Sequence, residues 1–193
     1  MIEQKDEIIG LFKIYYRFGV VIMKIKKLTD TAIVPTRGTA GAAGFDLYAD
    51  SVEGEYRMEG DEVICAGGSQ VTVHTGIAMA IPHGYVGLVF PRSGLATKKG
   101  LRLSNCVGVI DEDYRGEIIV KMYQDCDFNK LSKASDKHEL ISDEVAENTI
   151  SFTLHDRVAQ IVFVKYDAFE LEVVEELDET ERGEGGFGHT GSK

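Results

Sequence analysis

The segment QVTVHTGIAMAIPHGYVGLVF, residues 70–90, decides the fold class. Its apolar residues form short or alternating runs rich in Val and Ile, with turn residues between them, and this pattern is typical of β-strands. The same pattern recurs on both sides of the segment. It predicts ten short strands, at residues 21–28, 45–49, 62–65, 70–74, 76–81, 84–90, 117–123, 150–154, 158–166 and 169–175.

Ten strands with almost no helical periodicity predict an all-β fold, a distorted jelly roll or β-sandwich. One short helix at most is expected, and the sequence SGLATKK after Pro91 is where it fits. The chain has 193 residues, 44% of them hydrophobic, which suffices for one well-buried domain. We expect this domain at residues 23–181, after an appendage or misassigned start at 1–22 and before a flexible glycine-rich arm at 182–193.

The composition excludes several classes of partner. The chain has 32 acidic and 21 basic residues, a net charge of −11, whereas a nucleic-acid or anionic-membrane surface needs a positive field. An anionic ligand must therefore meet a local cluster of cations. The three cysteines lie far apart without a CxxC pair, which disfavours disulfides and zinc clusters and suits a reducing cytoplasm. The first 22 residues do not resemble a signal peptide or a membrane span.

Residues 125–148 are polar and charged, and we interpret them as a long surface excursion inside the domain. A passive loop is the favoured interpretation, and a surface that binds a protein partner is the alternative. Residues 1–22 leave a similar choice, since a short amphipathic helix that binds a partner is the alternative to an appendage.

Two motifs carry residue types suited to phosphate chemistry. In PRSGLATKKG, Arg92 offers a planar fork to a phosphate, Ser93 offers a hydroxyl, and Gly94 lets backbone amides approach an anion. The alternative there is a solvated turn. In NCVGVIDEDYRGE, Asp111 follows an apolar pair, so its carboxylate is held at the mouth of a strand. It suits a general base or a metal-sphere ligand, and the alternative is a charged hairpin.

Two further segments carry candidate ligand-binding residues. In DRVAQIVF, Arg157 and Gln160 are three residues apart, so an extended strand points them to opposite faces and only one need face a ligand. In the tail RGEGGFGHTGSK, Phe187 suits stacking on a base, while Arg182, Thr190 and backbone amides suit phosphates. Without a ligand we expect the tail to be disordered, because its glycines contribute no apolar surface.

Five segments together resemble the five motifs of the homotrimeric dUTPases, the deoxyuridine 5′-triphosphate nucleotidohydrolases, in order and approximate spacing: AGFDLYA, PRSGLA, NCVGVIDEDYRGE, RVAQIVF and RGEGGFGHTG. The resemblance spans about residues 23–191. It implies a jelly-roll homotrimer with active sites shared between subunits, which hydrolyses dUTP to dUMP and pyrophosphate with Mg²⁺. It also implies a role in limiting uracil incorporation into DNA and in supplying dUMP for dTMP synthesis.

The resemblance implies a role for individual motif residues. Asp111 corresponds to the general base that deprotonates the water attacking the α-phosphorus in line. Mg²⁺ is expected on substrate phosphates and water without a direct protein ligand, and Asp46 is given a supporting place nearby. For uracil and deoxyribose the implied residues are Asn105, Gly108, Val109, Ile110, Tyr114 and Phe187. For the phosphates they are Arg92, Ser93, Gly94, Gln160, Arg182, Gly188 and Thr190, whereas we interpret Arg157 as structural or interfacial.

The chain departs from the compact members of this family in one place. Between Tyr114 and Arg157 lie 42 residues, and the excess coincides with the charged stretch 125–148. Cys106, inside the third motif, is interpreted as a small buried apolar residue in preference to a redox switch. Two rival functions are a dCTP deaminase on the same fold and a catalytically silent dUTP-sensing scaffold. The complete third motif and the glycine-rich tail favour the hydrolase.

Overall fold

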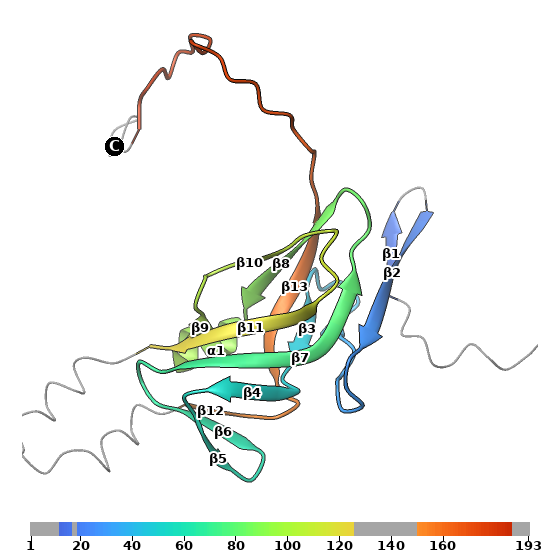
Figure 1. Cartoon of the computed structure of the whole chain (residues 1–193), viewed down its shortest axis with the longest axis vertical. Helices are drawn as coiled ribbons and strands as arrows, with labels where there is room; N and C mark the ends of the chain where they lie inside the picture. The colour runs from blue at the N-terminus through green and yellow to red at the C-terminus, as the bar shows by residue number, and fades with distance from the viewer. Residues whose placement is uncertain (1–11, 17–18, 126–149, 187–193) are drawn as a thin grey trace, which may run out of the picture.

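The computed structural model of the chain describes residues 12–16, 19–125 and 150–186. Within them it has thirteen strands and one short helix (Figure 1). The elements are β1 Phe12–Tyr16, β2 Gly19–Lys27, β3 Phe45–Tyr48, β4 Ser51–Gly54, β5 Arg57–Glu59, β6 Glu62–Cys65, β7 Gln70–Ala80, β8 Tyr85–Pro91, α1 Ser93–Lys99, β9 Leu101–Leu103, β10 Gly108–Ile110, β11 Glu117–Gln124, β12 Ile150–Thr153 and β13 Arg157–Lys165.

The strands form antiparallel sheets that enclose one hydrophobic core. A six-stranded sheet has the order β1-β2-β7-β11-β9 with β4 also paired to β7, a four-stranded sheet has the order β10-β8-β13-β3, and a small third sheet has the order β12-β6-β5. Alternate residues of the two larger sheets are buried against one another, because a strand points successive side chains to opposite faces. The largest of these buried side chains include Val73, Val120, Met122, Val89 and Ile161. The all-β sandwich with one short helix at SGLATKK is therefore confirmed.

The N-terminal hairpin extends past the edge of the six-stranded sheet. Strand β2 pairs with β7 through residues 24–27, whereas residues 19–23 of the same strand pair only with β1. Figure 1 shows this hairpin beside the sandwich. The strand predicted at residues 21–28 thus begins earlier, at Gly19.

A bend at Gly76 joins the two strands predicted at residues 70–74 and 76–81 into the single strand β7. Gly76 has φ +63°, and a Cβ there would lie 2.6 Å from the Ala32 side chain, so the bend requires glycine. The Gly76 N–H donates to Glu117 Oε1 at 2.7 Å, and His74 Nδ1 lies 2.8 Å from Glu117 Oε2. One carboxylate therefore fastens the start of β11 to the bend in β7.

We expect the His74–Glu117 pair to stabilise the fold more at acidic than at alkaline pH. The hydrogen bond with Glu117 raises the pKa of His74, burial lowers it by less, and the nearby Glu53 also raises it. A raised histidine pKa contributes stability below the ordinary value of about 6.5, and this stability is lost as pH rises through the folded-state pKa. The gap in urea midpoint between wild type and His74→Gln should be wider at about pH 5.5 than at about pH 8.5.

The matched control for this measurement is His83→Gln. The His83 side chain is 96% exposed, and such a pair contributes little to stability. A gap for His74→Gln that stays constant across the pH range, or that equals the gap for His83→Gln, would contradict the assignment.

The prediction of a strand at residues 169–175 is wrong for this chain. The segment has no strand partner among the described residues, and its alternating apolar side chains are exposed: Phe169 by 83%, Leu171 by 95% and Val173 by 99%. Figure 1 shows the chain running away from the sheets after β13. The excursion at 125–148 lies outside the described residues except for Asp125, and within the described part no helix is long and apolar enough to cross a membrane.

Candidate active site

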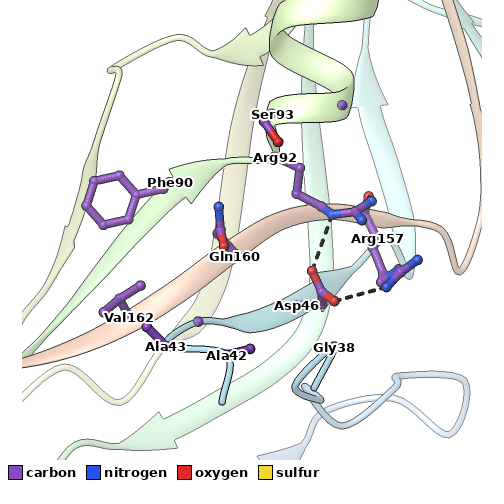
Figure 2. Close-up of a pocket in the computed structure, with 12 residues that line it drawn as sticks. Gly38, Ala42, Ala43, Asp46, Phe90, Arg92, Ser93, Arg157, Gln160 and Val162 are labelled. Atoms are coloured by element: carbon purple, nitrogen blue, oxygen red, sulfur yellow. Dashed lines mark hydrogen bonds and ion pairs between the residues drawn. The ribbon is translucent and has the colours of Figure 1, made fainter. Parts of the chain in front are cut away.

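A pocket of about 420 Å³ opens on the outer face of the four-stranded sheet, beside the start of α1 (Figure 2). The pairing register explains why the strands meet there. Gln160 of β13 lies opposite Asp46 of β3 on one side and Phe90 of β8 on the other, so these three side chains share one face. The neighbouring row of Phe45, Val89 and Ile161 faces the core. Five residues predicted from separate motifs line this pocket: Asp46, Arg92, Ser93, Gly94 and Gln160.

Asp46 organises the charges of the pocket. Its side chain is 14% exposed and lies between two guanidiniums: Arg92 Nε is 3.3 Å from Oδ1, and Arg157 Nη1 is 3.3 Å from Oδ2 (Figure 2). Arg92 Nη1 also donates to the Arg157 main-chain oxygen at 2.9 Å. Two cations and one anion line the pocket, so its formal charge is +1 in a chain of net charge −11. The arrangement is the local cation cluster that an anionic ligand needs.

Gln160 is held at the floor of the pocket. Its Nε2 donates to the Pro91 carbonyl oxygen at 3.3 Å, which ties β13 to the end of β8. A Cβ at Gly44 would lie 2.9 Å from Gln160 Oε1, so glycine at this position leaves room for the amide. The side-chain amide is thereby oriented before any ligand binds.

Arg157 lies in this pocket, contrary to the expectation that Arg157 and Gln160 point to opposite faces. A β-bulge is the reason: Arg157 lies opposite Tyr48 and Gln160 opposite Asp46, with one extra residue on β13 between them. Tyr48 and Asp46 are two apart on β3 and share a face, so their partners do too. The interpretation of Arg157 as mainly structural or interfacial did not place it in this pocket, and the bulge leaves no signal in the sequence.

A second cluster surrounds β10, which pairs with β8 through Gly108, Val109 and Ile110. Asp111 follows directly, and its carbonyl oxygen accepts the Tyr114 N–H at 3.2 Å in a turn. The Asp111 side chain is exposed, and within the described residues its carboxylate has no hydrogen-bond partner. An exposed carboxylate without a partner is available to accept a proton from water.

Two aromatic and polar residues of this cluster are also accessible. Tyr114 is 42% exposed, and its hydroxyl donates to the Glu117 carbonyl oxygen at 3.0 Å, which argues against a core-packing role. Asn105 is exposed in the loop before β10. Neither residue lines the pocket around Asp46, and Asp111 does not line it either. Apart from Arg182 in the tail, one chain therefore presents the described site residues in two separate groups.

The cysteines in the described residues differ in environment. Cys65 is buried in the core, and burial raises the pKa of its thiol to about 11. Cys106 is exposed, with φ +62°, in the loop between β9 and β10. The interpretation of Cys106 as a buried apolar residue is therefore wrong, because the loop turns at this position and points the thiol outward.

The tail begins with a turn around Arg182. Arg182 Nε donates to the Gly185 carbonyl oxygen at 2.8 Å, and the Gly183 N–H donates to the Thr180 carbonyl oxygen at 3.0 Å. Phe187, Gly188 and Thr190 lie outside the described residues.

A family model, related sequences and solved structures all match this chain, and all three point to the same family. The dUTPase family model matches residues 30–130 and 144–191. A deoxyuridine 5′-triphosphate nucleotidohydrolase of Syntrophotalea carbinolica is 42% identical over 173 residues, covering 89% of this chain and 97% of that protein. A protein of the same name from Corynebacterium glutamicum is 41% identical over 169 residues, covering 88% and 94%. The solved dUTPase of Staphylococcus bacteriophage 80alpha with dUPNHPP is similar with a TM-score of 0.69 at 26% identity, covering 88% and 98%.

Proposed function

Because the chain belongs to the dUTPase family and is a dUTP-hydrolysing enzyme, we propose that it converts dUTP to dUMP and pyrophosphate by in-line attack of water on the α-phosphate. One observation carries the proposal: residues from three sequence motifs meet in one pocket around paired guanidiniums. The similar phage enzyme was solved with dUPNHPP, which supports a uracil nucleotide as the ligand here.

The pocket around Asp46 binds the phosphates in this proposal. Arg92 and Arg157 supply the positive charge, and Ser93, Gly94 and Gln160 supply hydrogen-bonding groups. Asp46 supports them by fixing both guanidiniums, because a carboxylate between two cations restricts the rotamers of each. Phosphoryl transfer depends mainly on such positioning and charge neutralisation.

Asp111 acts as the general base. Its partner-free carboxylate accepts a proton from the water that attacks the α-phosphorus, and the turn to Tyr114 holds its main chain. The leaving group is pyrophosphate, and the hydroxyl oxygen from the water remains on the phosphate of dUMP. The bond that breaks joins the α-phosphorus to the oxygen that bridges it to the β-phosphorus. The α-phosphorus therefore remains in dUMP, and the β-phosphorus leaves in pyrophosphate.

The cluster around β10 binds the nucleoside. Asn105 and the backbone of Gly108, Val109 and Ile110 read the uracil edge, so a narrow hairpin rejects the 5-methyl group of thymine and the donor pattern of cytosine. Tyr114 lies beneath the deoxyribose and excludes a 2′-hydroxyl. In the tail, Phe187 stacks on uracil, and Arg182, Gly188 and Thr190 contact phosphates when the tail closes.

Magnesium fits this donor set as a cofactor held by substrate phosphates and water. Asp46 is the one carboxylate among the lining residues, and its oxygens already face Arg92 and Arg157, so the pocket wall offers no carboxylate cage. Mg²⁺ typically keeps several waters and binds through phosphate oxygens. When bound, it would neutralise phosphate charge and polarise the phosphoryl oxygens.

A homotrimer with shared active sites accounts for the separation of the two groups. The phosphate pocket of one subunit would meet the β10 cluster of a neighbour, and exposed apolar side chains of that cluster, such as Val109, would be covered by the contact. The tail of a subunit would then close over a neighbour's substrate. The enzyme would thereby limit uracil incorporation into DNA and supply dUMP for dTMP synthesis in the cytoplasm.

The proposed domain division keeps residues 23–181 as the catalytic domain and 182–193 as the lid. Residues 1–22 remain an appendage or a misassigned start in this proposal, whereas the alternative of a short amphipathic helix is wrong for residues 12–16 and 19–22, which form strands. The excursion is supported by the gap that the family model leaves at residues 131–143. A passive loop remains the proposal for it, with a protein-binding surface as the alternative.

Pyrophosphate release from dUTP, dTTP, dCTP and UTP, each with and without Mg²⁺, tests this function. We expect release from dUTP with Mg²⁺ at a kcat/KM at least about 10²-fold above that for the other three nucleotides. Ammonia release from dCTP is the control for deaminase activity. Equal rates with dUTP and dTTP, or ammonia from dCTP, would contradict the proposal.

A further inference from the structure

Three acidic residues follow β10, and only the middle one is engaged on both carboxylate oxygens. Glu112 Oε2 accepts the Gly84 N–H at 2.5 Å, and Oε1 accepts from His83 Nδ1 at 2.8 Å. Both partners lie in the turn between β7 and β8. The Glu112 carbonyl oxygen also accepts from Arg115 Nη1 at 2.6 Å. Asp111, one residue earlier, is fixed only through its main chain.

Tyr166 also takes part in this contact. The Tyr166 N–H donates to the Gly84 carbonyl oxygen at 3.0 Å, directly after β13 ends. Burial raises the pKa of Tyr166, and the interaction of its hydroxyl with the Glu112 carboxylate raises it further. The hydrogen bond from His83, followed by the Gly84 N–H, lowers the pKa of Glu112, so this carboxylate is held in its ionised form. Four groups from three segments therefore converge on Glu112.

We propose that Glu112 is a positioning residue for the reaction, which locks the Asp111 turn to the β7–β8 turn and so aims the Asp111 carboxylate. This inference rests on the proposed role of Asp111 as general base. Glu112 is not itself the base, because both of its oxygens accept hydrogen bonds from the protein. Its side chain acts on the main chain of its neighbour, whose own carboxylate remains exposed to water.

Loss of the Glu112 contacts should lower turnover more than it weakens substrate binding. The phosphate pocket around Asp46 lies apart from Glu112 and shares no lining residue with its contacts. Release of the turn would let the Asp111 carboxylate drift from the attacking water, and a displacement of about 1 Å costs on the order of 10²-fold in rate. Ground-state contacts with the triphosphate would remain.

Four variants of the full chain test the proposal: Glu112→Ala, Glu112→Gln, Asp111→Asn and the double variant of Asp111→Asn with Glu112→Ala. Glu55→Ala, which removes an exposed glutamate elsewhere, is the control. Glu112→Ala should lower kcat by roughly 10–100-fold with KM and dUPNHPP affinity within about twofold of wild type. Glu112→Gln keeps an oxygen for the Gly84 N–H, so kcat should recover to within about fivefold of wild type. Glu55→Ala should match wild type.

The double variant separates a positioning role from a general structural one. If Glu112 acts through Asp111, adding Glu112→Ala to Asp111→Asn should change the residual kcat by less than about twofold. Wild-type kcat in Glu112→Ala would overturn the proposal. A full multiplicative loss in the double variant would overturn it as well. Near-normal turnover of Asp111→Asn would remove the proposed base itself, whereas an inactive Asp111→Asn with an unaffected Glu112→Ala removes only the positioning role.

Discussion

Replacing Asp111 by asparagine should lower kcat for dUTP hydrolysis by roughly 10²–10⁴-fold, because an amide cannot take the proton of the attacking water. The substitution preserves side-chain volume and leaves the turn to Tyr114 intact, since that hydrogen bond uses the main chain. Binding of dUPNHPP should therefore stay within about threefold of wild type. Steady-state pyrophosphate release and calorimetric titration with dUPNHPP measure the two effects separately.

A substitution at Asp113, such as Asp113→Glu, would not serve as a control, because Asp113 lies in the same turn as Asp111. Glu55→Asn changes an exposed carboxylate outside the candidate site and is the matched control. Comparable turnover of Asp111→Asn and Glu55→Asn would show that another group accepts the proton.

Removing residues 182–193 should reduce kcat/KM for dUTP by about 10²-fold or more while the oligomeric state is unchanged. The truncation deletes the Arg182 turn and the proposed glycine-rich lid, whose contacts with the substrate we expect to form only in the bound complex. The core is untouched, since the chain has left the sheets after β13 (Figure 1). Pyrophosphate assays and light scattering after size-exclusion chromatography provide the readouts.

A shorter truncation that removes residues 187–193 and keeps Arg182 separates the guanidinium from the aromatic ring. We expect it to lose activity as well, because Phe187 is then absent. Full activity of the longer truncation would show that the tail is not a lid. Loss of the oligomer in that variant would show instead that the tail has an assembly role.

The fold could be predicted where a strand has one buried face. In β11 alternate residues are buried, and in β13 a short apolar run contains the buried residues Val158, Ala159 and Ile161, so both strands were located to within a residue or two. The segment at 169–175 carries the same pattern, but its apolar side chains are exposed in this chain. The pattern reports that one face is apolar and does not report which neighbour, if any, covers that face.

The sequence could predict which residues belong to the candidate site, but it could not predict how they are arranged in space. Arg92, Ser93, Gly94 and Gln160 converge as their motifs indicate, whereas Arg157 joins them only because of the bulge in β13. The proposed role of Glu112 also depends on a turn that lies 28 residues earlier in the sequence. Long-range contacts of this kind depend on the strand register, which local periodicity does not specify.

The contrast between the two described cysteines offers a route to observing nucleotide binding directly. Cys65 is protonated and shielded at neutral pH, whereas Cys106 is exposed beside Asn105. After replacement of Cys126 by serine, a maleimide fluorophore would attach at a single position next to the proposed uracil contact. Its emission would then follow the arrival and departure of dUPNHPP in real time, without any engineered cysteine.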